Sequence, residues 1–265
     1  MMIKALVLAL LGMTSVFHVQ SGVPVIVLAD NSYPPYSYEV NGEAAGIYTD
    51  ILLHAFRQMT EYNIEIHPVP WKRGLKQLEL GESFALYPPY LRKETRPYID
   101  PYSTPILAEK IVLVCREEIF VENKRVNWPE DFSGLTIGRN SGFEMFSDYF
   151  WKFAEKNRIK VEEARGNHLN ILKLLKKRIP CYVNDKISIL WGLEKLKQSG
   201  EYKPAIHGNI KQGPVLSSEW GYLGYTNRGL EHYPFKKDFI KKLDSILTQM
   251  RKNGLIDKIV NNYIK

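Results

Sequence analysis

The sequence has 265 residues, of which 45% are hydrophobic and 25% are charged, and its formal net charge is +7. This composition is that of a globular protein and excludes a disordered chain. The length suits one large domain or two of ordinary size. Lys and Arg residues are spread along the chain, and their small clusters at 173–178 and 236–242 fall on helical patterns, so we expect no nucleic-acid partner.

The N-terminal residues 1–21 have the pattern of a secretory signal peptide. Lys4 precedes the apolar run ALVLALLGMTSVF, and the small residues around Ser21 offer a cleavage site. The alternative is a helix buried in the fold. Because the run is short for a membrane span, we expect it to be removed and the mature protein to be periplasmic.

Strands and helices alternate along the rest of the chain. The first half predicts a strand at 23–29, a helix at 46–60, a strand at 63–70, a helix at 71–82 and a strand at 84–90. The second half predicts strands at 110–115, 135–138, 159–164 and 179–185, and helices at 143–157, 168–178 and 186–200. A strand-like run at 220–227 and two helices around Gly254 close the chain. This order predicts an α/β protein with two lobes.

Four loops at strand ends carry the candidate ligand-binding residues, because ligands of open α/β sheets bind beyond the carboxyl ends of the strands. In the first loop, Asp30, Tyr33 and Tyr36 flank Pro34 and Pro35, which hold the backbone extended. Aromatic walls and one carboxylate on a rigid loop suit a small polar ligand. The alternative is a turn that only caps the core.

The second loop covers residues 87–96. Arg96 or Arg92 can grip a carboxylate through two parallel hydrogen bonds, whereas the alternative for either residue is a surface salt bridge. We also assign the aromatic residues Trp71 and Tyr90 to the predicted cleft.

The third loop covers residues 138–146, where Asn140 or Ser141 is a candidate N-cap of the predicted helix. The amides from Gly142 onward would then face an anion at the positive end of that helix, with Arg139 as a fixed charge. An ordinary cap explains Ser141 equally well. In the fourth loop, at 182–186, Asp185 is either an N-cap or a second carboxylate for a ligand ammonium.

Catalytic and metal-binding motifs are absent from the sequence. The six His residues have no H-x-x-x-H or H-E-x-x-H spacing, and neither a P-loop nor G-x-G-x-x-G occurs. We therefore expect no enzyme, no cofactor and no metal. Cys115 and Cys181 can form a bridge in an exported protein or stay as two buried thiols, and their spacing does not decide between these states.

Four segments in order resemble the type II periplasmic solute-binding proteins of family 3, the extracellular binding proteins of polar amino-acid ABC transporters. They are YPPYSYEVNGEAAGIYTDIL, LELGES with RKETRPYIDPYSTP, FSGLTIGRNSGFEMF and MRKNGLIDKIVNNYI. The resemblance implies two mixed sheets flanked by helices and joined by a two-strand hinge. It places lobe 1 at 23–109 plus 217–265 and lobe 2 at 110–216. It also implies a monomer that hands its solute to an ABC permease in the inner membrane.

By position, Arg96 matches the arginine that clamps the α-carboxylate in this family, and Asp185 matches the acid that commonly holds the α-ammonium. Asp30 and Tyr33 match cleft residues of the first lobe, and the stretch 140–142 matches the ligand-facing loop of the second lobe.

The sequence departs from the family pattern just before Arg96. Pro89 and Leu91 replace a small Gly and a Thr whose backbone and hydroxyl hold the carboxylate, and Lys93 replaces another Thr. Since proline has no amide to donate, the ligand is either an amino acid or a larger, aromatic or differently charged solute. Two other roles stay open on the same fold: a sensor that reports its ligand to a receptor, and an enzyme that resembles cyclohexadienyl dehydratases.

Overall fold

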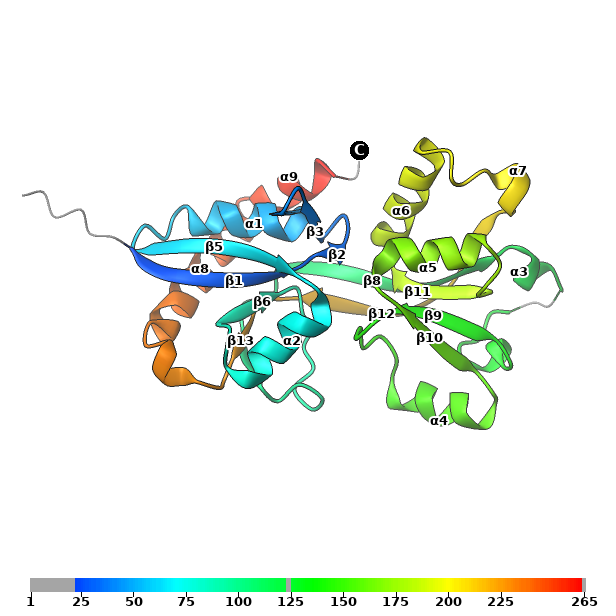
Figure 1. Cartoon of the computed structure of the whole chain (residues 1–265), viewed down its shortest axis with the longest axis horizontal. Helices are drawn as coiled ribbons and strands as arrows, with labels where there is room; N and C mark the ends of the chain where they lie inside the picture. Colours follow the sequence, from blue (N-terminus) through cyan, green and yellow to red (C-terminus); the bar gives the residue numbers. More distant parts are fainter. Residues whose placement is uncertain (1–21, 123–124, 264–265) are drawn as a thin grey trace, which may run out of the picture.

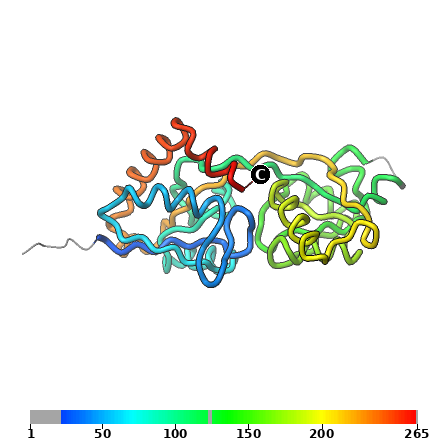
Figure 2. The backbone as a smooth tube through the Cα atoms, turned by 90° about the horizontal axis from the view of Figure 1, so that it is seen from above, coloured from blue at the N-terminus to red at the C-terminus, as the bar shows by residue number. Residues whose placement is uncertain are grey.

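The computed structural model describes residues 22–122 and 125–263, so the predicted signal peptide lies outside the described residues. The chain forms two lobes that lie side by side (Figure 1). Two long antiparallel strands, β8 (Leu107–Arg116) and β12 (Ile210–Gly221), run from one lobe to the other (Figure 2). The predicted α/β class and the two-lobed architecture with a two-strand hinge are confirmed.

The first lobe is built on a mixed sheet. Its order is β5 (Tyr62–Val69), β1 (Val23–Asp30), β6 (Ala85–Tyr87), β13 (Gly224–Thr226) and β7 (Ile99–Tyr102). Strand β1 is parallel to β5 and β6, and β13 is antiparallel to both of its neighbours. Helices α1 (Ile47–Phe56), α8 (Lys236–Lys252) and α9 (Leu255–Asn261) cover the larger apolar core, and α2 (Trp71–Leu80) covers a smaller one.

The tyrosine-rich loop after β1 folds into a small antiparallel sheet of its own. Its strands are β2 (Ser32–Tyr33), β3 (Ser37–Val40) and β4 (Glu43–Ala45). The hydroxyl of Ser37 donates to the carbonyl of Asp30 at 2.7 Å, which ties this sheet to the end of β1. The prolines and the Asn41-Gly42 turn therefore belong to a compact structure that fixes Tyr33 and Tyr36, both of which are buried.

The second lobe is built on another five-stranded sheet. Its order is β10 (Lys160–Ala164), β9 (Thr136–Asn140), β11 (Cys181–Asp185), β8 and β12. Helices α5 (Gly166–Leu175) and α6 (Lys186–Gln198) pack on one apolar cluster, and α4 (Asp148–Lys156) packs on the other. Short helical segments complete the described chain: α3 (Glu118–Glu122), η1 (Glu130–Phe132), α7 (Pro204–His207) and η2 (Leu230–His232).

Cys115 and Cys181 form a disulfide. They face each other across the antiparallel pair of β8 and β11, and both side chains are fully buried. The alternative of two free thiols is thereby excluded, and the bridge fastens a hinge strand to the centre of the second sheet.

Two predicted elements differ from the structure. The helix expected at 143–157 begins only at Asp148, with Ser147 as its N-cap, because residues 142–144 are held by side chains of the first lobe. The strand-like run at 220–227 is the end of β12 followed by β13, which belong to different sheets. Most of β12 was not predicted because Gly213 and Pro214 break the alternation, and the pairing register shifts there.

No helix within 22–122 or 125–263 is both long and apolar enough to cross a membrane.

The expected lobe boundaries, 109/110 and 216/217, fall inside β8 and β12. They stay a prediction.

Candidate ligand-binding site

A cavity of about 20 Å³ lies between the lobes. Its lining residues come from both lobes: Asp30, Tyr33, Trp71, Pro88, Tyr90, Arg92, Arg96, Phe143 and Glu144. A space of this size holds roughly one water molecule, whereas small-molecule pockets measure about 300–1,000 Å³. A second cavity of about 160 Å³ shares Asp30, Trp71 and Phe143 with the first. A third cavity, of about 700 Å³, also lies between the lobes and shares Arg92 and Glu144 with the first. Side chains of the protein therefore fill most of the cleft around Arg96, while a wider space remains beside it.

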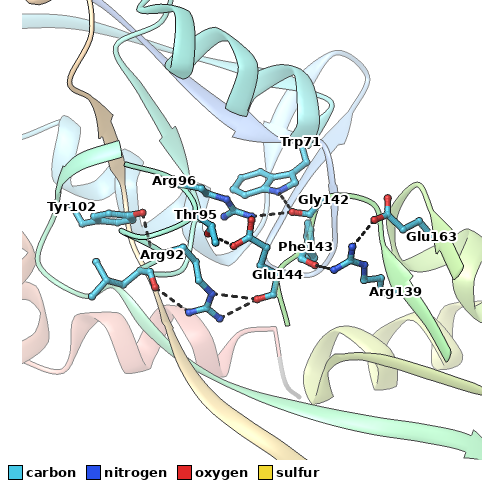
Figure 3. Close-up of polar contacts among 11 residues, drawn as sticks. Trp71, Arg92, Thr95, Arg96, Tyr102, Arg139, Gly142, Phe143, Glu144 and Glu163 are labelled. Carbon is cyan, nitrogen blue, oxygen red and sulfur yellow. Dashed lines mark hydrogen bonds and ion pairs between the residues drawn. The ribbon is translucent and has the colours of Figure 1, made fainter. Parts of the chain in front are cut away.

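Arg96 is the central cation of this cleft and is only 4% exposed. Its guanidinium donates to the carbonyl of Gly142 at 2.9 Å and lies 3.5 Å from the carboxylate of Glu144 (Figure 3). It also lies over the ring of Trp71 at 5.6 Å, in cation–π geometry. Burial lowers the pKa of Arg96, and the charge of Glu144 opposes that shift.

Residues 142–144, which follow β9, extend from the second lobe into the first. The indole of Trp71 donates to the Gly142 carbonyl at 3.3 Å, and Arg92 donates to the Glu144 carbonyl at 3.0 Å. The ring of Phe143 contacts Tyr33 edge-on at 5.2 Å and Trp71 at 5.8 Å. Gly142 has φ +79°, a conformation that favours glycine and lets the chain turn here.

A buried carboxyl group, Glu109, lies on β8 beside the cleft. The hydroxyl groups of Tyr33, Tyr48 and Tyr90 all donate to it, the last at 2.7 Å. Burial, together with the charge of Asp185, raises the pKa of Glu109 to about 8. The three tyrosines are thus held in place by one acid on a hinge strand.

Two further acids border this region. Asp30 is 1% exposed and accepts the amide of Ser32 at 2.9 Å, and burial raises its pKa to about 7. Asp185 is the N-cap of α6 through the amide of Ser188 at 3.0 Å, and it also accepts the amide of Lys110 at 2.9 Å. Burial raises the pKa of Asp185 as well.

The predicted site residues therefore divide into two groups. Five of them, Asp30, Tyr33, Trp71, Tyr90 and Arg96, line the small cavity, and the Gly142 carbonyl accepts a hydrogen bond from Arg96. Asn140 and Ser141 line the cavity of about 160 Å³, while Tyr36 is buried and its ring lies 5.1 Å from that of Tyr33.

The predicted helix N-terminus does not form where it was expected, and Arg139 is paired with an acid. Arg139 lies outside the two smaller cavities but lines the third, and it pairs with Glu163 at 2.7 Å (Figure 3). Because α4 begins at Asp148, neither Asn140 nor Ser141 is a helix cap, and the amides from Gly142 onward do not form an anion site at a helix end. That expectation was wrong, since tertiary contacts hold this segment outside the helix.

Glu109 and Glu144 were not predicted as site residues. The alternation of buried and exposed residues in β8 places Glu109 on the same face as the buried Leu107 and Ile111, so a two-residue period is a signal for its burial. No local pattern indicates the role of Glu144, because its partners Thr95 and Arg96 lie in the other lobe. Among the described residues, no group of three or more His, Cys, Asp or Glu side chains is placed to hold a metal ion.

The raised pKa of Glu109 predicts how stability depends on pH. An acid whose pKa is higher in the folded than in the unfolded state favours folding while it is protonated in both states, and this contribution is lost as the pH rises. For Glu109 the loss falls between about 4.5 and about 8. We expect urea unfolding to show stability falling over this range, by an amount on the order of a few kcal/mol.

Glu109→Gln is the matched test, because it keeps a hydrogen-bonding side chain of similar shape and cannot ionise. Asp30 contributes with the same sign up to about pH 7. The comparison of wild type and variant therefore isolates Glu109, and the gap should widen from pH 5 to pH 8 in favour of the variant. An equal pH dependence in both proteins would contradict the assignment.

The two lobes, the hinge strands and the cleft between the lobes define a fold of the two-lobed binding-protein type. The family model for bacterial extracellular solute-binding proteins, family 3, matches residues 25–265. The chain belongs to this family. No curated protein sequence matches it.

Solved structures with the same fold have low sequence identity to this chain. One comes from work on glutathione import via GshT and the cystine ABC importer TcyBC of Streptococcus mutans, with 18% identity, a TM-score of 0.72 and coverage of 91% of this chain and 95% of that one. A histidine kinase sensor domain with similarity to periplasmic binding proteins has 14% identity, a TM-score of 0.73 and coverage of 92% and 97%. The ancestral amino-acid-binding protein AncCDT-1, a precursor of cyclohexadienyl dehydratase, has 16% identity, a TM-score of 0.67 and coverage of 91% and 96%. At these identities the likeness concerns the fold alone.

Proposed function

We propose that the protein is an exported solute-binding protein that traps a small polar solute, an amino acid or related small carboxylate, between its lobes for ABC-type uptake. The observation that carries the proposal is Arg96, a buried guanidinium at the interlobe cavity, held among aromatic side chains. Buried charges need a partner, and a solute carboxylate could take the place of Glu144, which lies 3.5 Å from this guanidinium. No reaction is catalysed in this proposal.

The proposed ligand contacts are the residues assigned from the sequence that lie at the two smaller cavities. Arg96 would bind a carboxylate, Asp30 would accept from an ammonium or hydroxyl, and Tyr33, Trp71 and Tyr90 would form the aromatic walls. Asp185 is less suited than the sequence suggested, because amides of Ser188 and Lys110 already occupy its oxygens.

Closure of the two lobes on the β8 and β12 hinge would hold the solute, with the lobes divided at 109/110 and 216/217. In the proposed setting the protein acts in the periplasm as a monomer, after loss of residues 1–21. It would deliver its solute to a permease of the inner membrane. Membership of an extracellular solute-binding family supports this setting.

A thermal-shift panel tests the proposal on the mature protein, residues 22–265. The panel covers amino acids, di- and tricarboxylates, polyamines and aromatic acids. A solute at about 100 times its Kd adds about 2.7 kcal/mol to the stability of the folded state, which raises Tm by roughly 5–10 °C at this size. If no solute in the panel raises Tm, the proposal fails.

The alternative role, sensing without transport, is favoured by the likeness to a histidine kinase sensor domain. Uptake of the identified solute separates the two roles. Cells that lack the protein should lose high-affinity uptake if it feeds a permease, and uptake should be unchanged if it only reports to a receptor.

A further inference from the structure

The segment Gly142–Glu144 occupies the cleft as a ligand would. Its three residues present two carbonyl oxygens, an aromatic ring and a carboxylate to the first lobe (Figure 3). With the segment in place the cavity around Arg96 measures only about 20 Å³, so a solute that reaches Arg96 needs the space that the segment now fills.

The contacts of Arg96 with this segment indicate which chemical group a solute must carry in order to replace the segment. Among the described residues, Arg96 has its hydrogen-bond acceptor in the Gly142 carbonyl and its carboxylate partner in Glu144. If the segment withdraws, this buried guanidinium loses both partners, and an unpaired buried charge is strongly unfavourable. A solute that takes the place of the segment must therefore bring an anionic acceptor to Arg96.

The surroundings of the Phe143 ring indicate which apolar group the ligand carries beside its anionic group. It packs against apolar clusters of both lobes and sits edge-on to Tyr33 and Trp71. When it leaves, a slot lined by aromatic rings remains beside Arg96. Aromatic rings prefer edge-to-face or offset neighbours, so another flat ring fills this slot best.

The backbone allows the segment to be displaced. Residues 141–147 belong to neither a strand nor a helix. The Glu144 carboxylate is partly exposed, its side chain being 35% accessible, and it lies 3.5 Å from Arg96, so this pair is weaker than a buried bidentate one. A free solute that binds Arg96 with two parallel hydrogen bonds can compete with it.

We propose that Gly142–Glu144 is an internal occupant of the binding site and that the solute is an aromatic carboxylic acid, which displaces it. The proposal rests on the proposed solute-binding function and narrows its ligand class. Glu144 is then a residue that sets affinity, because its carboxylate competes with that of the solute for Arg96.

Phenylacetate is the probe for this proposal, with acetate as the acid without a ring and 2-phenylethylamine as the ring without an acid. Titration calorimetry and thermal shift on residues 22–265 should detect binding of phenylacetate and of neither control compound.

Glu144→Gln should tighten phenylacetate binding about three- to ten-fold, because the competing charge is gone. Glu163→Gln is the matched variant, since Glu163 also pairs across the lobes, with Lys72 at 3.0 Å, but neither residue lines the cavity around Arg96. We expect it to change the affinity less than about two-fold.

The possible results test the ligand class, the internal competition and the solute-binding function separately. If a non-aromatic solute binds and phenylacetate does not, the ligand class is wrong while the solute-binding function stands. If phenylacetate binds but Glu144→Gln weakens it or leaves it unchanged, internal competition is excluded. Phe143→Ala gives an independent check: it should not weaken phenylacetate binding, and a loss would show that Phe143 is a wall of the site and not its occupant. If no solute in the wider panel raises Tm, the proposed solute-binding function is wrong as well.

Discussion

Replacing Arg96 by alanine is expected to abolish measurable solute binding, with a loss of affinity of about 100-fold or more. Removing one partner of a buried, hydrogen-bonded charge pair costs about 2–5 kcal/mol, and a hundred-fold loss corresponds to about 2.7 kcal/mol. Arg96 is 4% exposed and faces the interlobe cavity, so a solute carboxylate held there would lose its main partner. Calorimetric titration with the solute found in the panel measures the effect.

Arg139→Ala is the control for Arg96→Ala. Arg139 carries the same charge and was also predicted as a site residue, but it pairs with Glu163 and does not line the cavity around Arg96. Its loss should change affinity only a few-fold. Because Arg96 also holds the closed arrangement through Gly142, circular dichroism and Tm without solute must show that the Arg96→Ala protein is folded. Equal effects of the two variants would contradict the central role of Arg96.

Removing the disulfide is expected to destabilise the protein by about 4 kcal/mol. Cys115 and Cys181 are 66 residues apart in the sequence, and closing a loop of this length lowers the entropy of the unfolded chain by an amount worth about 4 kcal/mol. Guanidinium unfolding of the double variant Cys115→Ala/Cys181→Ala measures the loss. Tryptophan fluorescence follows the second lobe, because Trp128, Trp151 and Trp191 lie there.

The wild-type protein in reducing buffer is the control for the disulfide variant. If the bridge is the cause, reduction should produce a similar loss, and reducing buffer should not affect the double variant. A loss below about 1 kcal/mol in both comparisons would show that the bridge adds little to the stability of the second lobe.

Elements whose signals are local were predicted from the sequence. The apolar residues of α8 recur at helical spacing, and Phe239, Leu243, Leu247 and Met250 are indeed buried. Helix α2 ends before Gly81, which has φ +74° as a C-cap glycine should. Such patterns depend on residues within one or two helical turns, and these residues are close neighbours in the sequence.

The parts of the site that escaped prediction depend on distant partners. Tyr33 and Glu109 are 76 residues apart, and Arg96 and Gly142 are 46 apart. The first contact forms only when β8 packs beside the tyrosine-rich loop, and the second forms only when the lobes meet. The second contact, with others from the first lobe, holds residues 142–144 outside a helix that local periodicity predicts. Tertiary contacts outweigh local propensity here, because helix propensities differ by only tenths of a kcal/mol per residue.

The sequence by itself therefore determined the α/β order, the two-lobed architecture and five residues of the small cavity: Asp30, Tyr33, Trp71, Tyr90 and Arg96. The tertiary structure alone decided the disulfide pairing, the path of β12 and the filling of the cleft by Gly142–Glu144. The physical reason is the range of the interactions. Periodicity and turn chemistry are encoded within a few residues, whereas a cleft is made by side chains that only the closed fold brings together.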